Sequence, residues 1–203
     1  METNIATPAD LLSTLPPVEL VSVNVAEPEI IGTFRGQPIT SGIAKQPVTQ
    51  EILRLDWLNL EGDRQADLRV HGGRDKAVYA YPSEHVVRWN ADLTPETPYG
   101  PGRFGENLTT RGWLEDAVHI GDIWAWGDAL LQVSEPRHPC FKLGIRTGRR
   151  DVIKRMEANG RSGWYLRVLQ PGLVPVAGPI TVVSRALDAP TVLETTGGLG
   201  DWR

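Results

Sequence analysis

Residues 120–135, with the sequence IGDIWAWGDALLQVSE, decide the fold class of this chain. Two apolar segments, 120–126 and 129–135, are separated by the dipeptide Gly127-Asp128. Strand-like segments joined by two turn-forming residues predict a β-hairpin. This is the strongest structural signal in the sequence, and it predicts a domain built mainly from strands.

The segments on either side of this hairpin also favour short strands. The 203 residues include 21 glycines and 16 prolines, which interrupt long helices. A turn at 34–38 is expected to join two strands. The strands predicted outside the hairpin are 18–25, 39–48, 53–60, 77–81, 164–169 and 180–184.

Two helices and one long loop interrupt the strands. Residues 82–92 begin with Pro82, which suits the first position of a helix, and their apolar residues recur at helical spacing. Residues 149–159 also have an apolar side, and they end at Gly160, as a helix typically does. The Pro- and Gly-rich loop 94–104 is expected to cover another part of the protein.

The chain is expected to contain one mixed α+β domain, rich in β-structure and barrel-like, at residues 18–187. Residues 1–17 are predicted to be an N-terminal lead-in, and residues 188–203 a Gly-rich, peripheral tail.

A net charge of −4 argues against a basic nucleic-acid-binding protein. No secretory signal and no apolar run of about 18 residues are visible, so a cytoplasmic protein without a membrane span is expected. The oligomeric state stays open.

Cys140 is the one cysteine of the sequence, and it lies among the cationic residues Arg137 and Lys142, beside His138. One thiol excludes an internal disulfide and a zinc site with two or more thiolates. An inert buried thiol, a nucleophile and a single thiolate ligand to a cofactor's metal remain open. Nearby cations lower the pKa of a cysteine and favour its thiolate.

Two glycine-rich turns carry cationic residues. The tripeptide Gly62-Asp63-Arg64 is followed by the segment 71–76, with the sequence HGGRDK. Adjacent glycines let backbone amides approach an anion, and Arg and Lys side chains add donors suited to a phosphate. A tight turn with a solvated charged rim is the alternative.

Two further residues could bind a ligand. The Asn107 amide offers a hydrogen-bond donor and an acceptor, which could recognise the edge of a heterocycle. An ordinary asparagine in a turn is the alternative. Lys45 follows a turn of small residues and could equally be a surface lysine. The segment 100–105 matches the spacing GxGxxG, but it lacks the strand before it and the helix after it that a dinucleotide site requires.

Four blocks of sequence, 41–45, 62–76, 104–108 and 132–143, resemble in order and spacing the MOSC domain family. This family is related to the C-terminal part of molybdenum cofactor sulfurases. The resemblance spans about residues 18–185 and is closest to the stand-alone bacterial branch, the N-hydroxylaminopurine reductase type.

The resemblance implies a MOSC-type β-barrel with a few peripheral helices, which binds the molybdenum cofactor (molybdopterin) and not pyridoxal phosphate. The role of the catalytic metal ligand maps onto Cys140. The residues expected to hold the cofactor are Lys45, Arg64, His71, Gly72, Gly73, Lys76, Asn107 and Arg137.

The implied activity is the reduction of small N-hydroxylated molecules such as N-hydroxylaminopurine. The sequence has no dinucleotide motif, no cysteine cluster for iron–sulfur and no haem motif, so a separate reductase is expected to supply the electrons. Two alternatives stay open: a protein that carries the cofactor without turnover, and a sulfur-transfer protein that uses a persulfide on Cys140.

Overall fold

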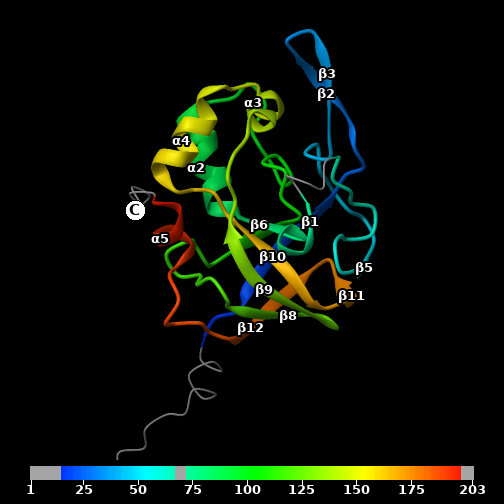
Figure 1. Ribbon diagram of the computed structural model, residues 1–203, viewed down its shortest axis with the longest axis vertical. Coiled ribbons are helices and arrows are strands. Elements are labelled where there is room, and N and C mark those ends of the chain that lie inside the picture. The colour runs from blue at the N-terminus through cyan, green and yellow to red at the C-terminus, as the bar shows by residue number, and fades with distance from the viewer. Residues whose placement is uncertain (1–14, 67–71, 198–203) are drawn as a thin grey trace, which may run out of the picture.

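The protein is a closed β-barrel flanked by short helices in the computed structural model, which describes residues 15–66 and 72–197 (Figure 1). Pairing of the last strand with the first closes the ring. One neighbouring pair, β6 with β7, is parallel, and the other pairs of the ring are antiparallel. In order around the ring the strands are β1 (Val18–Val25), β12 (Gly178–Ser184), β8 (Ile123–Trp126), β9 (Ala129–Pro136), β10 (Trp164–Gln170), β6 (Val78–Pro82) and β7 (Leu108–Arg111). The predicted β-rich barrel is confirmed.

The hairpin predicted at 120–135 is formed by β8 and β9. Trp126 pairs with Ala129, so the loop consists of Gly127 and Asp128. Gly127 has φ of +56°, and a Cβ there would lie 2.5 Å from the carbonyl oxygen of Leu173. Glycine is therefore required both by the turn conformation and by the neighbouring chain.

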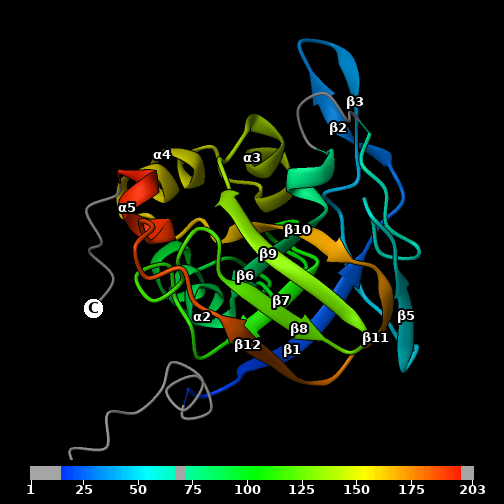
Figure 2. The same cartoon turned by 60° about the horizontal axis from the view of Figure 1, so that its bottom comes forward.

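A second hairpin projects away from the barrel (Figures 1 and 2). It consists of β2 (Glu29–Phe34) and β3 (Gln37–Ser41), and Phe34 pairs with Gln37. The two loop residues, Arg35 and Gly36, have φ of +52° and +77°, as a type I′ turn requires. The turn predicted at 34–38 is confirmed.

The prediction of one continuous strand at 39–48 is wrong. The chain forms β3, leaves the strand at Gly42 and pairs again only as β4 (Gln46–Pro47), which lies beside β1. Gly42 packs so closely on the Arg64 backbone that a Cβ would lie 2.1 Å from its carbonyl oxygen. This contact turns residues 42–45 inward, where they form part of the candidate site.

The strand predicted at 53–60 is shorter than expected. It ends as β5 (Ile52–Leu55), and a single bridge then joins Leu55 to Leu60. β5 pairs with β11 (Gly172–Pro175) in a two-stranded sheet outside the barrel.

Both predicted helices are present. α2 (Ser83–Leu93) begins one residue after Pro82, which is its N-cap, and it buries Val86 and Trp89. α4 (Asp151–Asn159) begins two residues later than predicted and ends at Gly160, whose φ is +70°. The 3-10 helix η1 (Arg74–Lys76) and the short helix α3 (Phe141–Thr147) lie beside the candidate site and were not predicted.

The segment 188–203 is more than a peripheral tail within its described part. Residues 192–196 form α5 (Val192–Thr196), which Thr191 and Glu194 cap reciprocally. Val192 is fully buried in the main core, and its backbone N–H donates to the carbonyl oxygen of Val118. The expectation of a peripheral tail is therefore wrong for residues 191–196.

Two hydrophobic cores share the strand β6, whose residues are all buried. Val78 and Ala80 belong to the core inside the barrel, whereas Tyr79 and Tyr81 belong to a second core under α2, α3 and α4. This alternation follows from the opposite directions of successive side chains along a strand. The candidate site lies at the edge of the second core, where the barrel wall meets the helices.

Candidate functional site

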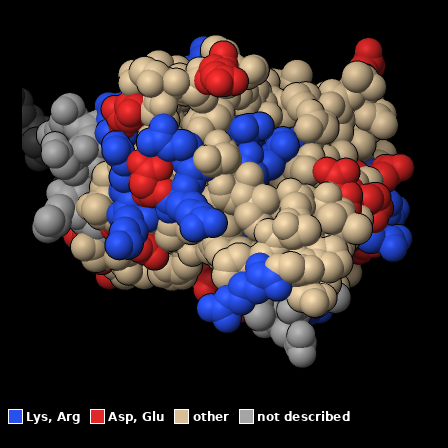
Figure 3. Space-filling view, turned by 90° about the horizontal axis from the view of Figure 1, so that it is seen from above, with Lys and Arg blue, Asp and Glu red and all other residues tan. Residues whose placement is uncertain are grey.

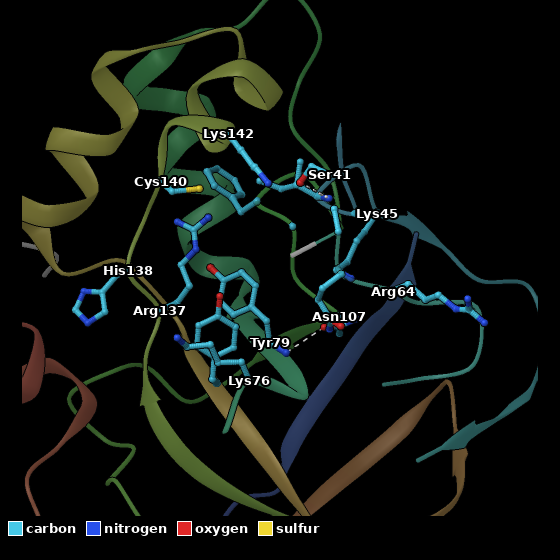
Figure 4. Close-up of a pocket in the computed structure, with 17 residues that line it drawn as sticks. Ser41, Lys45, Arg64, Lys76, Tyr79, Asn107, Arg137, His138, Cys140 and Lys142 are labelled. Carbon is cyan, nitrogen blue, oxygen red and sulfur yellow. Dashed lines mark hydrogen bonds between the residues drawn. The ribbon is translucent and has the colours of Figure 1, made fainter. Parts of the chain in front are cut away.

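A pocket on the outer side of the barrel wall brings together most of the residues predicted to bind a ligand (Figure 4). Six of the predicted residues line it: Lys45, Arg64, Lys76, Asn107, Arg137 and Cys140. Its remaining lining residues are Ser41, Gly42, Ile43, Gln65, Ala66, Tyr79, Phe104, Gly105, His138, Lys142 and Tyr165.

Backbone hydrogen bonds hold the segments of the pocket together. The Asn107 N–H donates to the carbonyl oxygen of Tyr79 at 2.8 Å, and the Asn24 N–H donates to that of Asn107 at 2.7 Å. The Arg64 N–H donates to the carbonyl oxygen of Ala26 at 2.9 Å. Residues distant in sequence thus meet because β1, β6 and β7 are neighbours in the barrel.

One side of the pocket, the Lys45 wall, consists of the lining residues Lys45, Arg64 and Asn107, with Asp63 behind them. The buried Lys45 ammonium contacts the buried Asp63 carboxylate. Burial lowers the pKa of Lys45, and the attraction of Asp63 opposes that shift. Asp63 Oδ1 also accepts from the Ala26 N–H at 3.0 Å, so the ion pair is tied to the backbone.

Asn107 on this wall is committed to the protein itself. Its Nδ2 donates to Asp63 Oδ2 at 3.0 Å and to the Asn24 carbonyl oxygen at 3.3 Å. Its Oδ1 accepts from the Tyr79 N–H at 3.1 Å. Both donor hydrogens are therefore used inside the protein, and the structure gives Asn107 a structural role beside the ligand-binding role that stays a prediction.

The opposite side, the Cys140 wall, consists of Arg137, Cys140, Lys142 and Tyr165. The chain leaves β9 at Arg137, and Cys140 is the N-cap of α3. Figure 4 shows the Arg137 guanidinium next to the sulfur of Cys140, whereas the exposed His138 points away from both. Lys142 Nζ donates to the Thr40 carbonyl oxygen at 3.3 Å, across the pocket mouth.

Arg137 is held firmly although it is a buried cation, 5% exposed. Its Nη1 contacts Met156 Sδ at 3.4 Å, and its guanidinium lies 5.5 Å from the centre of the Tyr79 ring. Burial lowers its pKa, but the nearby Tyr79, Tyr165 and Cys140 raise it more, so the pKa stands above its ordinary value. Arg137 therefore keeps its charge.

The pocket is strongly cationic. Of its described lining residues, five are Lys or Arg and none is Asp or Glu. Lys45 contacts Asp63, Arg64 Nε lies 3.6 Å from a Glu27 oxygen, and Lys76 Nζ lies 3.3 Å from a Glu135 oxygen. Such a pocket favours an anionic ligand.

The face of the molecule on the side of α3 and α4 carries both positive and negative charge (Figure 3). Seen from the side of α3 and α4, Lys and Arg gather in separate areas, one of which surrounds acidic atoms (Figure 3). On α4, Asp151 pairs with Arg149 and Arg155 at 3.0 Å each. The surface charge of α4 is thus partly neutralised locally.

Three predicted residues are not placed in the pocket. Gly72 and Gly73 are not among the described lining residues, and Gly73, with φ of +98°, is the N-cap of η1. His71 lies outside the described residues. The phosphate-binding roles of these three residues stay predictions.

Sequence reasoning missed the aromatic side of the pocket. Tyr79 and Tyr165 face each other across β6 and β10, with ring centres 5.4 Å apart. Both residues lie in predicted strands. Along those strands they alternate with Val78 and Leu166, whose side chains lie in the barrel core, so the two tyrosine side chains lie on the outer face of the barrel. Their contact depends on the register of β6 and β10, which are distant in sequence, so the sequence alone did not predict it.

The GxGxxG segment at 100–105, which was excluded as a dinucleotide site, is a loop that leads into β7 without a helix, as expected.

Comparisons with known proteins bear on what this pocket is. The profile of the MOSC domain matches residues 67–181, which is more than half of the chain. The chain belongs to the MOSC domain family. Protein YiiM from Escherichia coli is 43% identical over 154 residues, which cover 75% of this chain and 67% of that protein.

Other MOSC relatives add a structure and an activity name. The crystal structure of YiiM from Geobacillus stearothermophilus has a TM-score of 0.72 and 37% identity, covering 89% of this chain and 82% of that one. A protein from Gibberella moniliformis named "Reductase" is 40% identical over 152 residues, 74% of this chain but 27% of that protein. Among the described residues, no helix has the length and apolar character to cross a membrane.

Proposed function

We propose that this MOSC protein is a molybdenum-cofactor-dependent reductase that removes oxygen from small N-hydroxylated compounds, including base analogues such as N-hydroxylaminopurine. One observation carries the proposal. Cys140 lies in a pocket with five cationic side chains and no carboxylate among the described lining residues. A soft thiol and a cationic surround suit an anionic group that carries a soft metal.

The chemistry of the residues that line the pocket fits the molybdenum cofactor. Cys140 would ligate the metal, because a thiolate suits a soft, redox-active ion. Lys45, Arg64 and Lys76 would hold the phosphate and the polar edge of the pterin. When bound, the cofactor supplies the oxygen-atom and two-electron chemistry, while the protein supplies binding, orientation and electrostatics.

The chain's own residues would position the N–O group of the substrate. Arg137 offers a guanidinium next to Cys140 (Figure 4). Tyr165 lines the same pocket, and its hydroxyl hydrogen-bonds with Arg137. Burial raises the pKa of Tyr165, so its Oη keeps its proton at neutral pH and can donate a hydrogen bond to an oxygen. Arg137 would stabilise negative charge on that oxygen.

We further propose that a separate reductase delivers the electrons in the cytoplasm. The sequence has no motif for a nicotinamide, flavin or haem cofactor that could supply them. The fungal relative named "Reductase", of which the chain covers 27%, supports the reductase class but not the nature of the electron donor.

An assay with an artificial electron donor tests the proposal. The protein is purified from cells that make molybdopterin, and reduction of N-hydroxylaminopurine is followed with dithionite-reduced methyl viologen. Turnover that depends on molybdenum supports the reductase. Bound cofactor without turnover would instead indicate a carrier, and transfer of sulfur from Cys140 in cofactor-free protein would indicate the persulfide alternative.

A further inference from the structure

A buried acidic residue outside the pocket has no part in the reaction proposed above. Glu115 is fully buried in the segment between β7 and β8, and it is not among the described lining residues of the pocket. Its Oε2 hydrogen-bonds to Nε2 of the fully buried His85 on α2, at 2.7 Å. Its Oε1 accepts from the Gly163 N–H, also at 2.7 Å. A buried carboxylate needs such partners, and through them Glu115 ties α2 to the residue that precedes β10.

Gly163 is packed so tightly that its backbone has little freedom to move. Its φ is +66°, and a Cβ there would lie 2.4 Å from the carbonyl oxygen of Ala80 on β6. Its own carbonyl oxygen accepts from the Arg137 N–H at 3.1 Å. Gly163 therefore sets where the backbone of Arg137 lies, at the point where the chain leaves β9 toward Cys140.

The residue before Gly163 also supports Arg137, through the aromatic side of the pocket. The Ser162 carbonyl oxygen accepts from the Tyr79 hydroxyl at 2.8 Å, and the Arg137 guanidinium lies 5.5 Å from the centre of the Tyr79 ring. Figure 4 shows this guanidinium next to the sulfur of Cys140. Residues 162 and 163 thus hold Arg137 twice, once by its backbone and once by the ring on which its side chain packs.

We propose that Glu115 is a positioning residue for the Cys140 wall, and that His85 orients it. By holding Gly163, Glu115 keeps the Arg137 guanidinium beside the Cys140 sulfur. The consequence for turnover rests on the proposed function, whereas the placement of Arg137 does not. A role of Glu115 in stability alone would instead leave the surroundings of Cys140 unchanged in every variant that folds.

The reactivity of the Cys140 thiol in the cofactor-free protein tests this placement. Cys140 is the only cysteine of the sequence, so the mass of the protein reports its alkylation by iodoacetamide. Because a neighbouring cation favours the reactive thiolate, we expect Glu115→Ala, which displaces Arg137, to slow alkylation at neutral pH about threefold or more. Glu115→Gln keeps an oxygen that can accept from the Gly163 N–H, and its alkylation rate should match that of the wild type.

The matched control is Asp122→Ala, which removes another fully buried carboxylate. The Asp122 oxygens accept from the backbone N–H groups of His119 and Ala186, and Asp122 is not among the described lining residues of the pocket. Its loss should lower the urea midpoint but leave the alkylation rate unchanged. An unchanged rate in folded Glu115→Ala, or equal slowing in Asp122→Ala, would overturn the positioning role.

Glu115→Asp provides a second variant if Glu115→Ala does not fold. It keeps the charge, but its side chain is one methylene shorter and cannot reach both His85 and Gly163. Alkylation should therefore be slower in Glu115→Asp than in Glu115→Gln. The reverse order would show that the charge of Glu115 matters and not its hydrogen bond to Gly163, and it would overturn the proposal.

Steady-state kinetics of the cofactor-loaded protein test the consequence for turnover. We expect Glu115→Asp to lower kcat for N-hydroxylaminopurine about tenfold, because a displaced Arg137 no longer lies at the reacting oxygen. The KM should stay within about twofold of the wild-type value. Slower alkylation with an unchanged kcat would overturn the role in the reaction. If no cofactor loads into the wild type, the proposed function fails, while the alkylation rates still decide whether Glu115 positions Arg137.

Discussion

The two walls of the pocket differ in what their charged groups already bind. On the Lys45 wall, Lys45 and Asp63 neutralise each other, and Asn107 uses its amide to bind Asp63 and the backbone. On the Cys140 wall, Arg137 is buried by packing against Met156 and Tyr79 without a carboxylate. Both walls are cationic in sequence, but the buried cation of the first wall, Lys45, is paired with a carboxylate, whereas the buried cation of the second, Arg137, is not paired with a described Asp or Glu.

This difference separates stability from ligand binding. Removing a partner on the Lys45 wall leaves a buried charge or an unsatisfied polar group, so the folded state should suffer first. Removing a side chain on the Cys140 wall should lower the affinity of the pocket for its ligand more than it lowers the stability of the fold, because fewer contacts within the protein depend on that side chain. Three substitutions in the two walls probe this contrast, and a fourth on the surface of α4 serves as the comparison with the smallest expected effect.

The largest effect is expected for Cys140→Ser. A hydroxyl is a poor ligand for a soft metal, so turnover of N-hydroxylaminopurine should fall by at least about 100-fold. The thermal midpoint should change by no more than about 2 °C, because Cys140 is an N-cap whose side chain makes no capping hydrogen bond. Initial rates with the artificial donor and a melting curve measure the two quantities. Unchanged turnover would rule out the ligand role.

Asp63→Asn should give the largest loss of stability. It leaves the Lys45 ammonium buried without an anionic partner, which costs about 3–5 kcal/mol in comparable pairs. Urea unfolding measures the change. The control is Glu27→Gln, which removes the partner of Arg64 in a pair whose side chains are 74% and 62% exposed. Its effect should stay within about 1 kcal/mol, and equal losses in the two variants would contradict the contrast between buried and exposed pairs.

Asn107→Ala should cost about 2 kcal/mol of stability, because Asp63 Oδ2 and the Tyr79 N–H each lose a buried partner. The same urea titration measures it. A variant that loses cofactor but unfolds at the wild-type urea concentration would show instead that Asn107 serves the ligand and not the fold.

The smallest effect is expected for Asp151→Asn, on the exposed surface of α4. Hydrogen bonding to Arg149 lowers the pKa of Asp151 below its ordinary 3.8. The carboxylate therefore stabilises the fold above pH 3.8, and this contribution disappears as the pH falls through the lowered pKa. The thermal midpoints of wild type and variant should differ by at most about 2 °C at pH 6 and converge in acid. A difference that stays constant in acid would exclude the ionised carboxylate as its source.

The sequence predicted the barrel where the signals were local. The β8–β9 hairpin follows from a two-residue turn between apolar segments, and α2 follows from helical spacing after Pro82. β7 was missed because Leu108–Arg111 becomes a strand through its pairing with β1 and β6, which are distant in sequence. α3 was missed because it has only seven residues, one of them Gly144.

The sequence predicted many of the residues of the candidate site, but not the contacts between them. Cys140, Arg137 and Lys45 were found from residue type and motif order, and all three line the pocket. The pairing of Lys45 with Asp63 depends on a contact across 18 residues. The facing of Tyr79 and Tyr165 depends on the register of β6 and β10. Neither contact leaves a signal in a single sequence.

The most direct test of the central claim is the molybdenum content of the protein purified from cells that make molybdopterin. Elemental analysis of the wild type should give about one molybdenum per chain, together with an equimolar pterin. A wild-type protein that carries neither molybdenum nor pterin under these conditions would contradict the claim that the cationic pocket and Cys140 hold the cofactor.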